Sequence, residues 1–142
     1  MAAIDQAMVS KMINATSPTG ASGVPGTWTA LGGSAMKVKL TSTASTASAS
    51  GTELTGTGYT AGGTALGTAS TASSAGSSVT LPAGSALSWT NASGGSWSVQ
   101  SFELLDSAAL RTWFGNFNGA PVSVANGNTF QIAVGGITLA LS

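Results

Sequence analysis

The sequence lacks the residues from which most catalytic and metal sites are built. It contains no cysteine and no histidine, and its 142 residues include only four basic and four acidic side chains. Without cysteine there is no disulfide framework. Without histidine, cysteine or clustered carboxylates there is no typical ligand set for a metal ion. We therefore expect a protein that is not an enzyme, with no catalytic residues, no cofactor and no metal.

The charge balance also restricts the partners. The formal net charge is zero, and nucleic acids and anionic membranes attract basic patches. The longest apolar runs stay well short of the ~20 residues that a membrane-spanning helix requires. We expect neither a nucleic acid nor a membrane as partner.

Small side chains are what the sequence has in abundance. Ala, Ser, Thr and Gly supply 85 of the 142 residues, while the mean hydropathy is +0.31. Disorder usually combines low hydrophobicity with high net charge, and this chain has neither. The composition predicts one folded domain with a light core. Such a core needs a further source of stability, which we expect to be homo-oligomerisation, with a trimer favoured.

The N-terminal residues show a helical pattern. Ile4, Met8 and Met12 recur every four residues and form a one-sided apolar stripe. The spacing predicts a short amphipathic helix over 3–15. Pro18 disfavours helical geometry in the residue before it, so the helix should end there. The three apolar residues are our candidate partner-contact arm.

A segment rich in proline and glycine follows this helix. Residues 17–26 read SPTGASGVPG, which is typical of a connector. We therefore divide the chain into a helical arm with its connector, 1–26, and a single β domain, 27–142.

A clear strand pattern begins just inside that domain. Met36, Val38 and Leu40 alternate with Lys37 and Lys39, which is the period of two of a half-buried strand. This pattern predicts that both lysines face water.

The next stretch is dominated by small residues. TASTASAS at 43–50 and TASTAS at 68–73 cannot fill a core, so we interpret them as edge strands and loops. The intervening GTGYTA at 56–61 fits a dinucleotide-binding pattern formally, but it lacks the flanking strand, helix and acid. We interpret it as a turn. The glycosylation sequons at Asn14 and Asn91 are expected by chance in a chain so rich in Ser and Thr.

Large apolar residues gather in the C-terminal part. Trp97 and Val99 share one strand parity, whereas Phe102 and Leu104 share the other. Their strand is therefore either covered on both faces or shifted by a bulge.

Turn signals divide the rest of that part into short strands. Asn126–Gly127 predicts a hairpin before the last strand. In that strand the apolar parity changes at Gly135–Gly136, which predicts a bulge or bend. Many short strands with Gly and Asn turns indicate a mainly β protein, a β-sandwich or jelly-roll-like barrel, with the short N-terminal helix added.

The remaining candidates for chemistry have simpler structural interpretations. Glu103 and Asp106 are acids three residues apart, but a glycosidase needs two opposed carboxylates in a cleft. We interpret both as solvated ends of a strand and its turn. Four tryptophans could stack on sugars or bases if they are exposed together, but core packing is the better interpretation. They are Trp28, Trp89, Trp97 and Trp113.

The order of landmarks resembles a family of small β-rich virion proteins of tailed phages that infect actinobacteria, named minor capsid or tail fibre proteins. The landmarks follow the N-terminal helix in this order: MKVKLTST, GTELTGTGY, an Ala/Ser/Thr/Gly stretch, WSVQSFELLDS, LRTWFGNF and NGNTFQIAVGGITLAL. The resemblance covers nearly the whole chain and implies a structural role on the virion, with no catalytic residues to carry over.

Two virion roles follow from this resemblance. We favour a capsid decoration protein, a cyclic homo-oligomer on the virion surface that binds the major capsid protein and is assembled in the host cytoplasm. The alternative is a tail fibre or tail-tip β module that recognises a host surface glycan through exposed tryptophans. A fibre would need a long repeat or a heptad stalk, and the sequence has neither.

Overall fold

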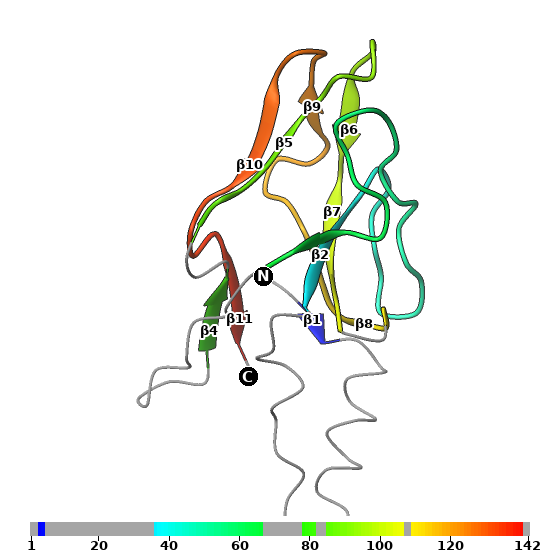
Figure 1. Cartoon of the computed structure of the whole chain (residues 1–142). Helices are drawn as coiled ribbons and strands as arrows, with labels where there is room; N and C mark the ends of the chain where they lie inside the picture. Colours follow the sequence, from blue (N-terminus) through cyan, green and yellow to red (C-terminus); the bar gives the residue numbers. More distant parts are fainter. Residues whose placement is uncertain (1–2, 5–35, 67–77, 82–84, 107–108, 141–142) are drawn as a thin grey trace, which may run out of the picture.

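A computed structural model describes residues 3–4, 36–66, 78–81, 85–106 and 109–140, and these residues form antiparallel β-structure (Figure 1). The largest sheet has five strands. Their order across the sheet is β1 (Ala3–Ile4), β8 (Arg111–Asn116), β7 (Ser101–Leu105), β2 (Lys37–Thr41) and β3 (Thr64–Ala65).

Six further strands form three two-stranded sheets. The pairs are β5 (Leu87–Thr90) with β10 (Thr129–Ile132), β4 (Ser78–Leu81) with β11 (Ile137–Ala140), and β6 (Trp97–Val99) with β9 (Val122–Val124). The expectation of a mainly β protein is confirmed. The part of the chain that the structure describes contains no helix, and so no helix there is long and apolar enough to cross a membrane.

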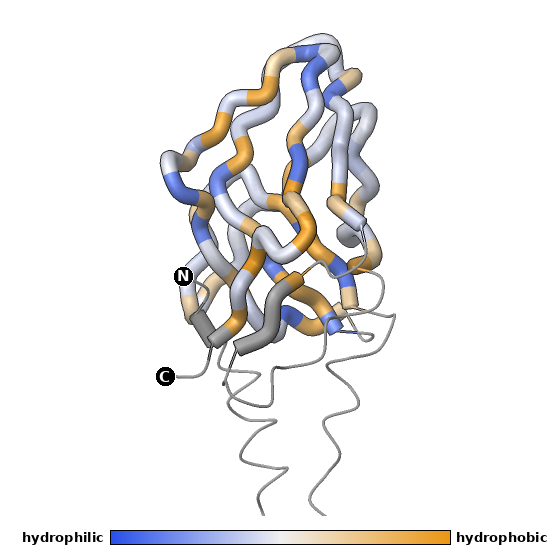
Figure 2. Tube along the Cα trace, turned by 90° about the vertical axis from the view of Figure 1, so that its left-hand side faces the viewer, coloured by the Kyte–Doolittle hydropathy of each residue, from blue (hydrophilic) through white to orange (hydrophobic). Residues whose placement is uncertain are grey.

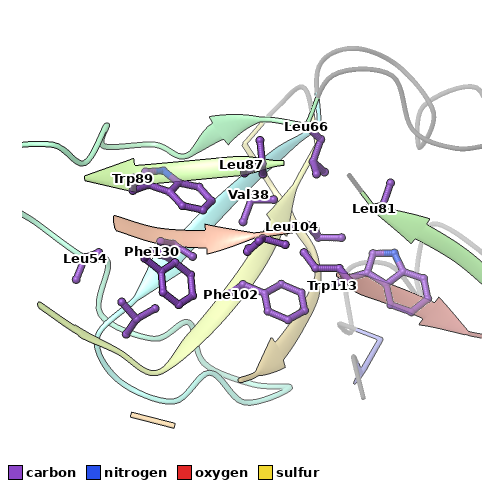
Figure 3. Packing of buried hydrophobic residues seen from close by; sticks show 14 of the residues in the cluster. Val38, Leu54, Leu66, Leu81, Leu87, Trp89, Phe102, Leu104, Trp113 and Phe130 are labelled. Carbon is purple, nitrogen blue, oxygen red and sulfur yellow. The ribbon is translucent and has the colours of Figure 1, made fainter. Parts of the chain in front are cut away.

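The core lies against one face of the large sheet, which we call the inner face. Strand alternation places Val38 and Leu40 of β2 on this face, beside Phe102 and Leu104 of β7 and Trp113 of β8. All five side chains are buried, and several are drawn in Figure 3. Figure 2 shows hydrophobic positions interspersed with polar ones along the chain.

A chain of aromatic rings connects the large sheet to the β5–β10 pair. The ring centroids of Phe102 and Phe117 are 5.4 Å apart, those of Phe117 and Phe130 are 5.1 Å apart, and those of Trp89 and Phe130 are 6.1 Å apart. The Trp89 Nε1–H group donates to Thr64 Oγ1 at 2.9 Å. These aromatic contacts, with the area that the rings bury, hold the two sheets together.

Three of the four tryptophans can be placed. Trp89, Trp97 and Trp113 are at most 5% exposed, which confirms their interpretation as core residues. Trp28 lies outside the described residues.

The change of parity between Val99 and Phe102 is explained by a break between two strands. β6 ends at Val99 and pairs with β9, whereas β7 begins at Ser101 and pairs with β2 and β8. Every residue of β7 is buried, so the expectation that both faces are covered is confirmed. A register irregularity occurs further along, where Thr112 of β8 is accommodated beside Leu104.

The predicted hairpin at Asn126–Gly127 is wrong, although its turn exists. Gly127 has a φ of +86°, and the Asn128 N–H group donates to the carbonyl of Ala125 at 3.0 Å. The strands on either side nevertheless pair with β6 and β5, not with each other. The turn chemistry determines the local reversal, but the burial of each apolar face determines which strand it pairs with.

The predicted last strand is two strands. β10 and β11 belong to different sheets, and the turn between them contains Gly135 at a φ of +70° and a hydrogen bond from the Gly136 N–H to the Ala133 carbonyl. The expected bend at the two glycines is therefore confirmed. Val134 lies in this turn and is 54% exposed, rather than facing inward with Phe130.

The first residues of the predicted helix 3–15 are a strand instead. Ala3 and Ile4 pair with Phe114 and Trp113 at the edge of the large sheet. This edge offers backbone hydrogen bonds that compete with the costly first turn of a short helix. The rest of 3–15, including Met8 and Met12, and the connector 17–26 lie outside the described residues.

Asn91 holds together the turns at one end of the fold. Its Nδ2 atom donates to the carbonyls of Gly95 and Val124, both at 2.7 Å, and its Oδ1 atom accepts from the N–H and the hydroxyl of Ser93. Its backbone N–H donates to the carbonyl of Asn128 at 2.9 Å. The side chain is fully buried, and its amide nitrogen donates to two carbonyls, so the fold leaves no room for a glycan on it. Asn14, the other sequon, lies outside the described residues.

We predict that Asn91→Ala lowers the free energy of unfolding by about 2–3 kcal/mol, because it removes the Asn91 donor from the buried Val124 carbonyl and the acceptor of the two Ser93 bonds. The control is Asn126→Ala, which removes one exposed hydrogen bond to the Gly94 N–H and should cost less than about 1 kcal/mol. Urea denaturation measures both. Equal losses would contradict the role that we assign to Asn91.

Candidate functional site

The most concentrated chemistry in the described residues lies on the other face of the large sheet, which we call the outer face. Glu103 of β7 is fully buried there. Its Oε2 atom is 2.5 Å from the Nζ atom of Lys39 on β2, and its Oε1 atom is 3.2 Å from Nη1 of Arg111 on β8. The expectation that Glu103 is solvated is wrong, and so is the expectation that Lys39 faces water. Lys37 is exposed, as expected.

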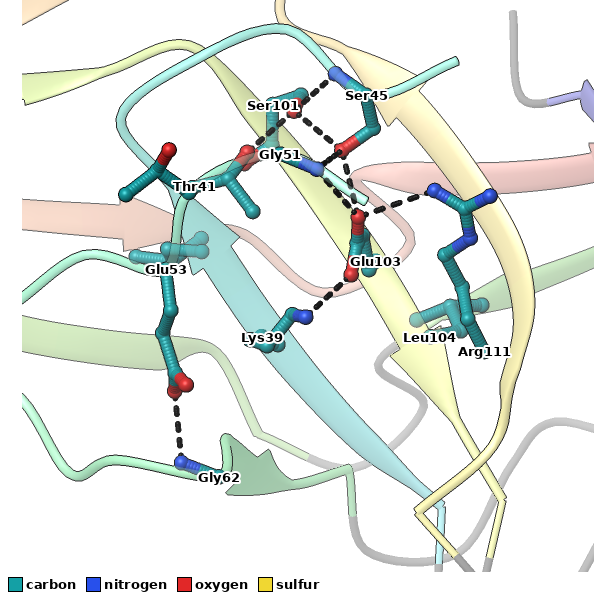
Figure 4. Close-up of polar contacts among 12 residues, drawn as sticks. Lys39, Thr41, Ser45, Gly51, Glu53, Gly62, Ser101, Glu103, Leu104 and Arg111 are labelled. Atoms are coloured by element: carbon teal, nitrogen blue, oxygen red, sulfur yellow. Dashed lines mark hydrogen bonds and ion pairs between the residues drawn. The ribbon is translucent and has the colours of Figure 1, made fainter. Parts of the chain in front are cut away.

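Residues 42–52 fold over this cluster, and we call them the cover loop. The hydroxyl of Ser45 and the N–H of Gly51 donate to Glu103 Oε1 at 2.7 and 3.0 Å. Arg111 reaches the same loop, because its Nη1 and Nη2 atoms donate to the carbonyls of Ala49 and Ala47 at 2.8 and 3.2 Å. Figure 4 shows Lys39, Arg111, Ser45 and Gly51 converging on the one carboxylate.

Small residues make this close approach possible. A Cβ atom at Gly51 would lie 2.4 Å from the carbonyl oxygen of Thr43, so no other residue fits without displacing backbone. Beside it, Thr41 and Ser101 are opposite each other on β2 and β7, and their hydroxyls are in contact. The Ser101 hydroxyl also accepts from the Ser45 N–H at 3.1 Å. The small side chains of residues 43–50 thus let the loop pack closely over a buried charge.

Glu103 is a carboxylate rather than a carboxylic acid. Burial raises the pKa of its carboxyl. The hydrogen bonds from Lys39, Ser45 and Gly51 together lower this pKa by more than burial raises it, so the net shift is downward. A buried charge of this kind is tolerated only where it is paired and hydrogen-bonded. The same contacts leave the carboxylate no access to a substrate.

A second carboxylate, that of Glu53, holds the loop that contains Tyr59 and Gly62. Glu53 Oε1 accepts from the Tyr59 hydroxyl at 3.1 Å and from the Gly62 N–H at 2.7 Å. The Tyr59 oxygen in turn accepts from the Leu40 N–H at 3.1 Å. Burial raises the pKa of the Tyr59 hydroxyl; the Leu40 hydrogen bond partly opposes this shift, and Glu53 adds to it.

The third described carboxylate closes the turn between β7 and β8. Asp106 is buried, and its Oδ1 atom accepts from the Leu110 N–H at 2.9 Å. Ala109 lies in this turn with a φ of +59°, which is unusual for a residue with a side chain. Asp106 is therefore part of the structure of a turn but not a solvated acid. Where the chain is described, no three His, Cys, Asp or Glu residues are grouped as metal ligands.

The predicted partner-contact arm is only partly visible. Ile4 lies in β1 at the edge of the large sheet, and its backbone pairs with Trp113. Met8 and Met12 lie outside the described residues, so the stripe remains a prediction. The GTGYTA segment is a turn, as expected, with Gly56 and Gly58 at φ values of +123° and +98°.

The charge pattern of the sequence did not predict the cluster beneath the cover loop, although one signal for it exists. Glu103 is flanked by Phe102 on one side and Leu104 and Leu105 on the other. A single acid within a run of large apolar residues indicates a buried strand, and a buried acid requires a cationic partner. The sequence alone does not identify that cation.

Comparison of the chain with protein-family models, with curated proteins and with solved structures gives no match.

We predict that Tyr59 ionises only well above pH 10 in the folded protein. It is the single tyrosine of the chain, so tyrosinate absorbance reports this one hydroxyl. Because its folded pKa is raised, the stability that it contributes is complete below about pH 10, the ordinary value. That stability is lost as the pH rises from there through the folded pKa.

The measurement compares the absorbance titration of native protein with that in urea, where the midpoint should be about 10. Glu53→Gln should lower the native midpoint, because it removes a negative charge beside the hydroxyl. Coincident native and urea titrations would contradict the arrangement of Tyr59 and Glu53.

Proposed function

We propose that the chain is a non-enzymatic structural protein of a phage virion, namely a capsid decoration or minor capsid protein that binds the major capsid protein. The observation on which this proposal depends is that the described acidic residues have structural roles. Each of the three described carboxylates, Glu53, Glu103 and Asp106, accepts hydrogen bonds that hold a loop or turn in place. A chain with so few ionisable groups, used in this way, is suited to form a stable surface rather than to perform acid–base chemistry.

We further propose that the strands form a β-sandwich in which the large sheet packs against the β5–β10 pair. The aromatic contacts from Phe102 through Phe117 to Phe130 support this arrangement. Figure 1 shows β5 and β10 on one side and β2, β7 and β8 on the other. Such a unit presents loops and short edges to its neighbours.

The assembly that we propose is a homo-oligomer, with a trimer favoured, on the virion surface after assembly in the host cytoplasm. Its attachment to the shell would use the N-terminal arm with Ile4, Met8 and Met12. Many copies of a modest interface give an avidity that one contact lacks. A light core would also gain stability from association.

The alternative role as a tail fibre or tail-tip module that recognises a glycan relies on exposed aromatic residues. Trp89, Trp97 and Trp113 are buried and are not available to stack on a sugar. The described residues therefore favour the decoration role.

Copy number in the virion tests the proposed function. We expect quantitative mass spectrometry of purified virions of the encoding virus to find this chain in hundreds of copies per particle, as a symmetric shell requires. A handful of copies would assign it to the tail tip. Its absence from the virion would overturn the structural proposal altogether.

The arm is tested by the double substitution Met8→Ser with Met12→Ser. If the apolar stripe attaches the protein to the shell, the variant should occupy capsids at least about tenfold less than the unaltered protein, because two apolar side chains would be lost from the contact. Gln6→Ser is the control, since position 6 lies off the stripe. Unchanged occupancy of the double variant would show that the arm does not make the attachment.

A further inference from the structure

The cover loop is attached to the sheet by polar groups and not by apolar burial. Residues 46–50 of the loop are exposed, and they are all Thr, Ala or Ser. Two residues of the loop, Ser45 and Gly51, are buried. Both of them donate to Glu103. Ser101 and Arg111 also bond to the loop, through Ser45, Thr43, Ala47 and Ala49. Glu103 is the one charged acceptor on the sheet to which both buried loop residues donate.

The contacts to Glu103 come from two directions. Lys39 and Arg111 belong to the sheet, whereas Ser45 and Gly51 belong to the loop. A charged acceptor makes hydrogen bonds about twice as strong as a neutral one. Neutralising Glu103 therefore weakens the hydrogen bonds from Ser45 and Gly51. It also leaves Lys39 and Arg111, the second of which bonds to the loop carbonyls, near each other without a counter-charge.

The strands beneath the loop have their own support. β2, β7 and β8 are joined by antiparallel pairing, and their inner faces pack in the core with Leu40 and Leu104 fully buried. What the loop covers is the outer face, including the side chains of Thr41, Ser101 and Glu103. Phe114 lies opposite Glu103 on this face, with the Arg111 guanidinium 5.0 Å from its ring centroid.

We propose that the cover loop is a charge-controlled cover, which opens as a unit when the Glu103 carboxylate is neutralised and bares the outer face of the sheet while β2, β7 and β8 stay paired. This proposal does not depend on the proposed function. It concerns a conformational change that the fold itself contains.

Acid is the natural trigger for such an opening. The groups that face Glu103 are Lys39 from β2, Arg111 from β8 and the loop donors, and Tyr59 is within electrostatic reach. Of Glu103 and these groups, only Glu103 carries a carboxyl, which is the kind of group that acid neutralises. Because the pKa of Glu103 is lowered, the loop should stay closed above the ordinary glutamate pKa and open as the pH falls through the lowered value.

Amide hydrogen exchange followed by NMR tests the proposal on the full chain. The loop reporters are the N–H groups of Ser45 and Gly51, which bond to Ser101 and Glu103. They are compared with the N–H groups of Phe102 and Leu104 in β7, which is paired with a strand on each side. Exchange rates are corrected for the intrinsic rate at each pH. As the pH of the unaltered protein is lowered, the loop amides should lose protection first and the sheet amides only at lower pH.

Two substitutions separate the loop contact from the fold. Ser45→Ala removes one loop donor and keeps the ion pairs, and it should lower loop protection at neutral pH by about tenfold or more, since hydrogen bonds to charged groups are strong. Ser50→Ala alters an exposed serine of the same loop and should change nothing. Glu103→Gln should abolish the acid dependence of loop protection, whereas Glu53→Gln, which removes a neighbouring carboxylate that makes no contact with the loop donors, should keep it.

Three results would overturn the proposal. Loop and sheet amides could lose protection together on acidification, which would make Glu103 a support of the whole fold. Ser45→Ala could leave loop protection unchanged, or Glu53→Gln could abolish the acid dependence. If Glu103→Gln does not fold, the pH series of the unaltered protein and the Ser45→Ala comparison still decide the question.

Discussion

The shortage of large side chains is the constraint on which the rest of the structure depends. Most of the large residues that the structure describes belong to one core, where Leu40, Val99 and Leu104 are fully buried. Loops built from Ala, Ser, Thr and Gly have no apolar anchor of comparable size. Buried polar residues hold them instead, with Glu103 beneath the cover loop and Asn91 among the turns at one end.

Small residues also allow backbone segments to approach closely. A Cβ atom at Gly58 would lie 1.8 Å from the carbonyl oxygen of Thr90, and one at Gly63 would lie 2.7 Å from that of Val38. Both glycines have positive φ values as well, so the turn that carries Tyr59 and Glu53 could not be built from larger residues. The abundance of glycine is thus a geometric requirement of these loops as well as a compositional feature.

The sequence predicted local structure better than it predicted pairing. The alternation through Val38 and Leu40 correctly placed a strand, because a period of two depends only on neighbouring residues. The Asn126–Gly127 turn was also correct, but the hairpin was not, since its strands bury their apolar faces in different sheets. Nothing local indicates that a serine 58 residues before Glu103 in the sequence donates to it.

The buried carboxylate at the centre of this arrangement has a particular energetic consequence. A buried ion pair often contributes little net stability compared with well-packed apolar residues, because removing the charges from water is costly. Breaking such a pair is nevertheless expensive, because an uncompensated charge remains. Glu103 with Lys39 and Arg111 therefore adds less to the total stability than to the choice of one loop conformation over others. An apolar residue at position 103 could fill the same space, but it could not accept the directional hydrogen bonds of Ser45 and Gly51 that hold an otherwise featureless loop in a single position.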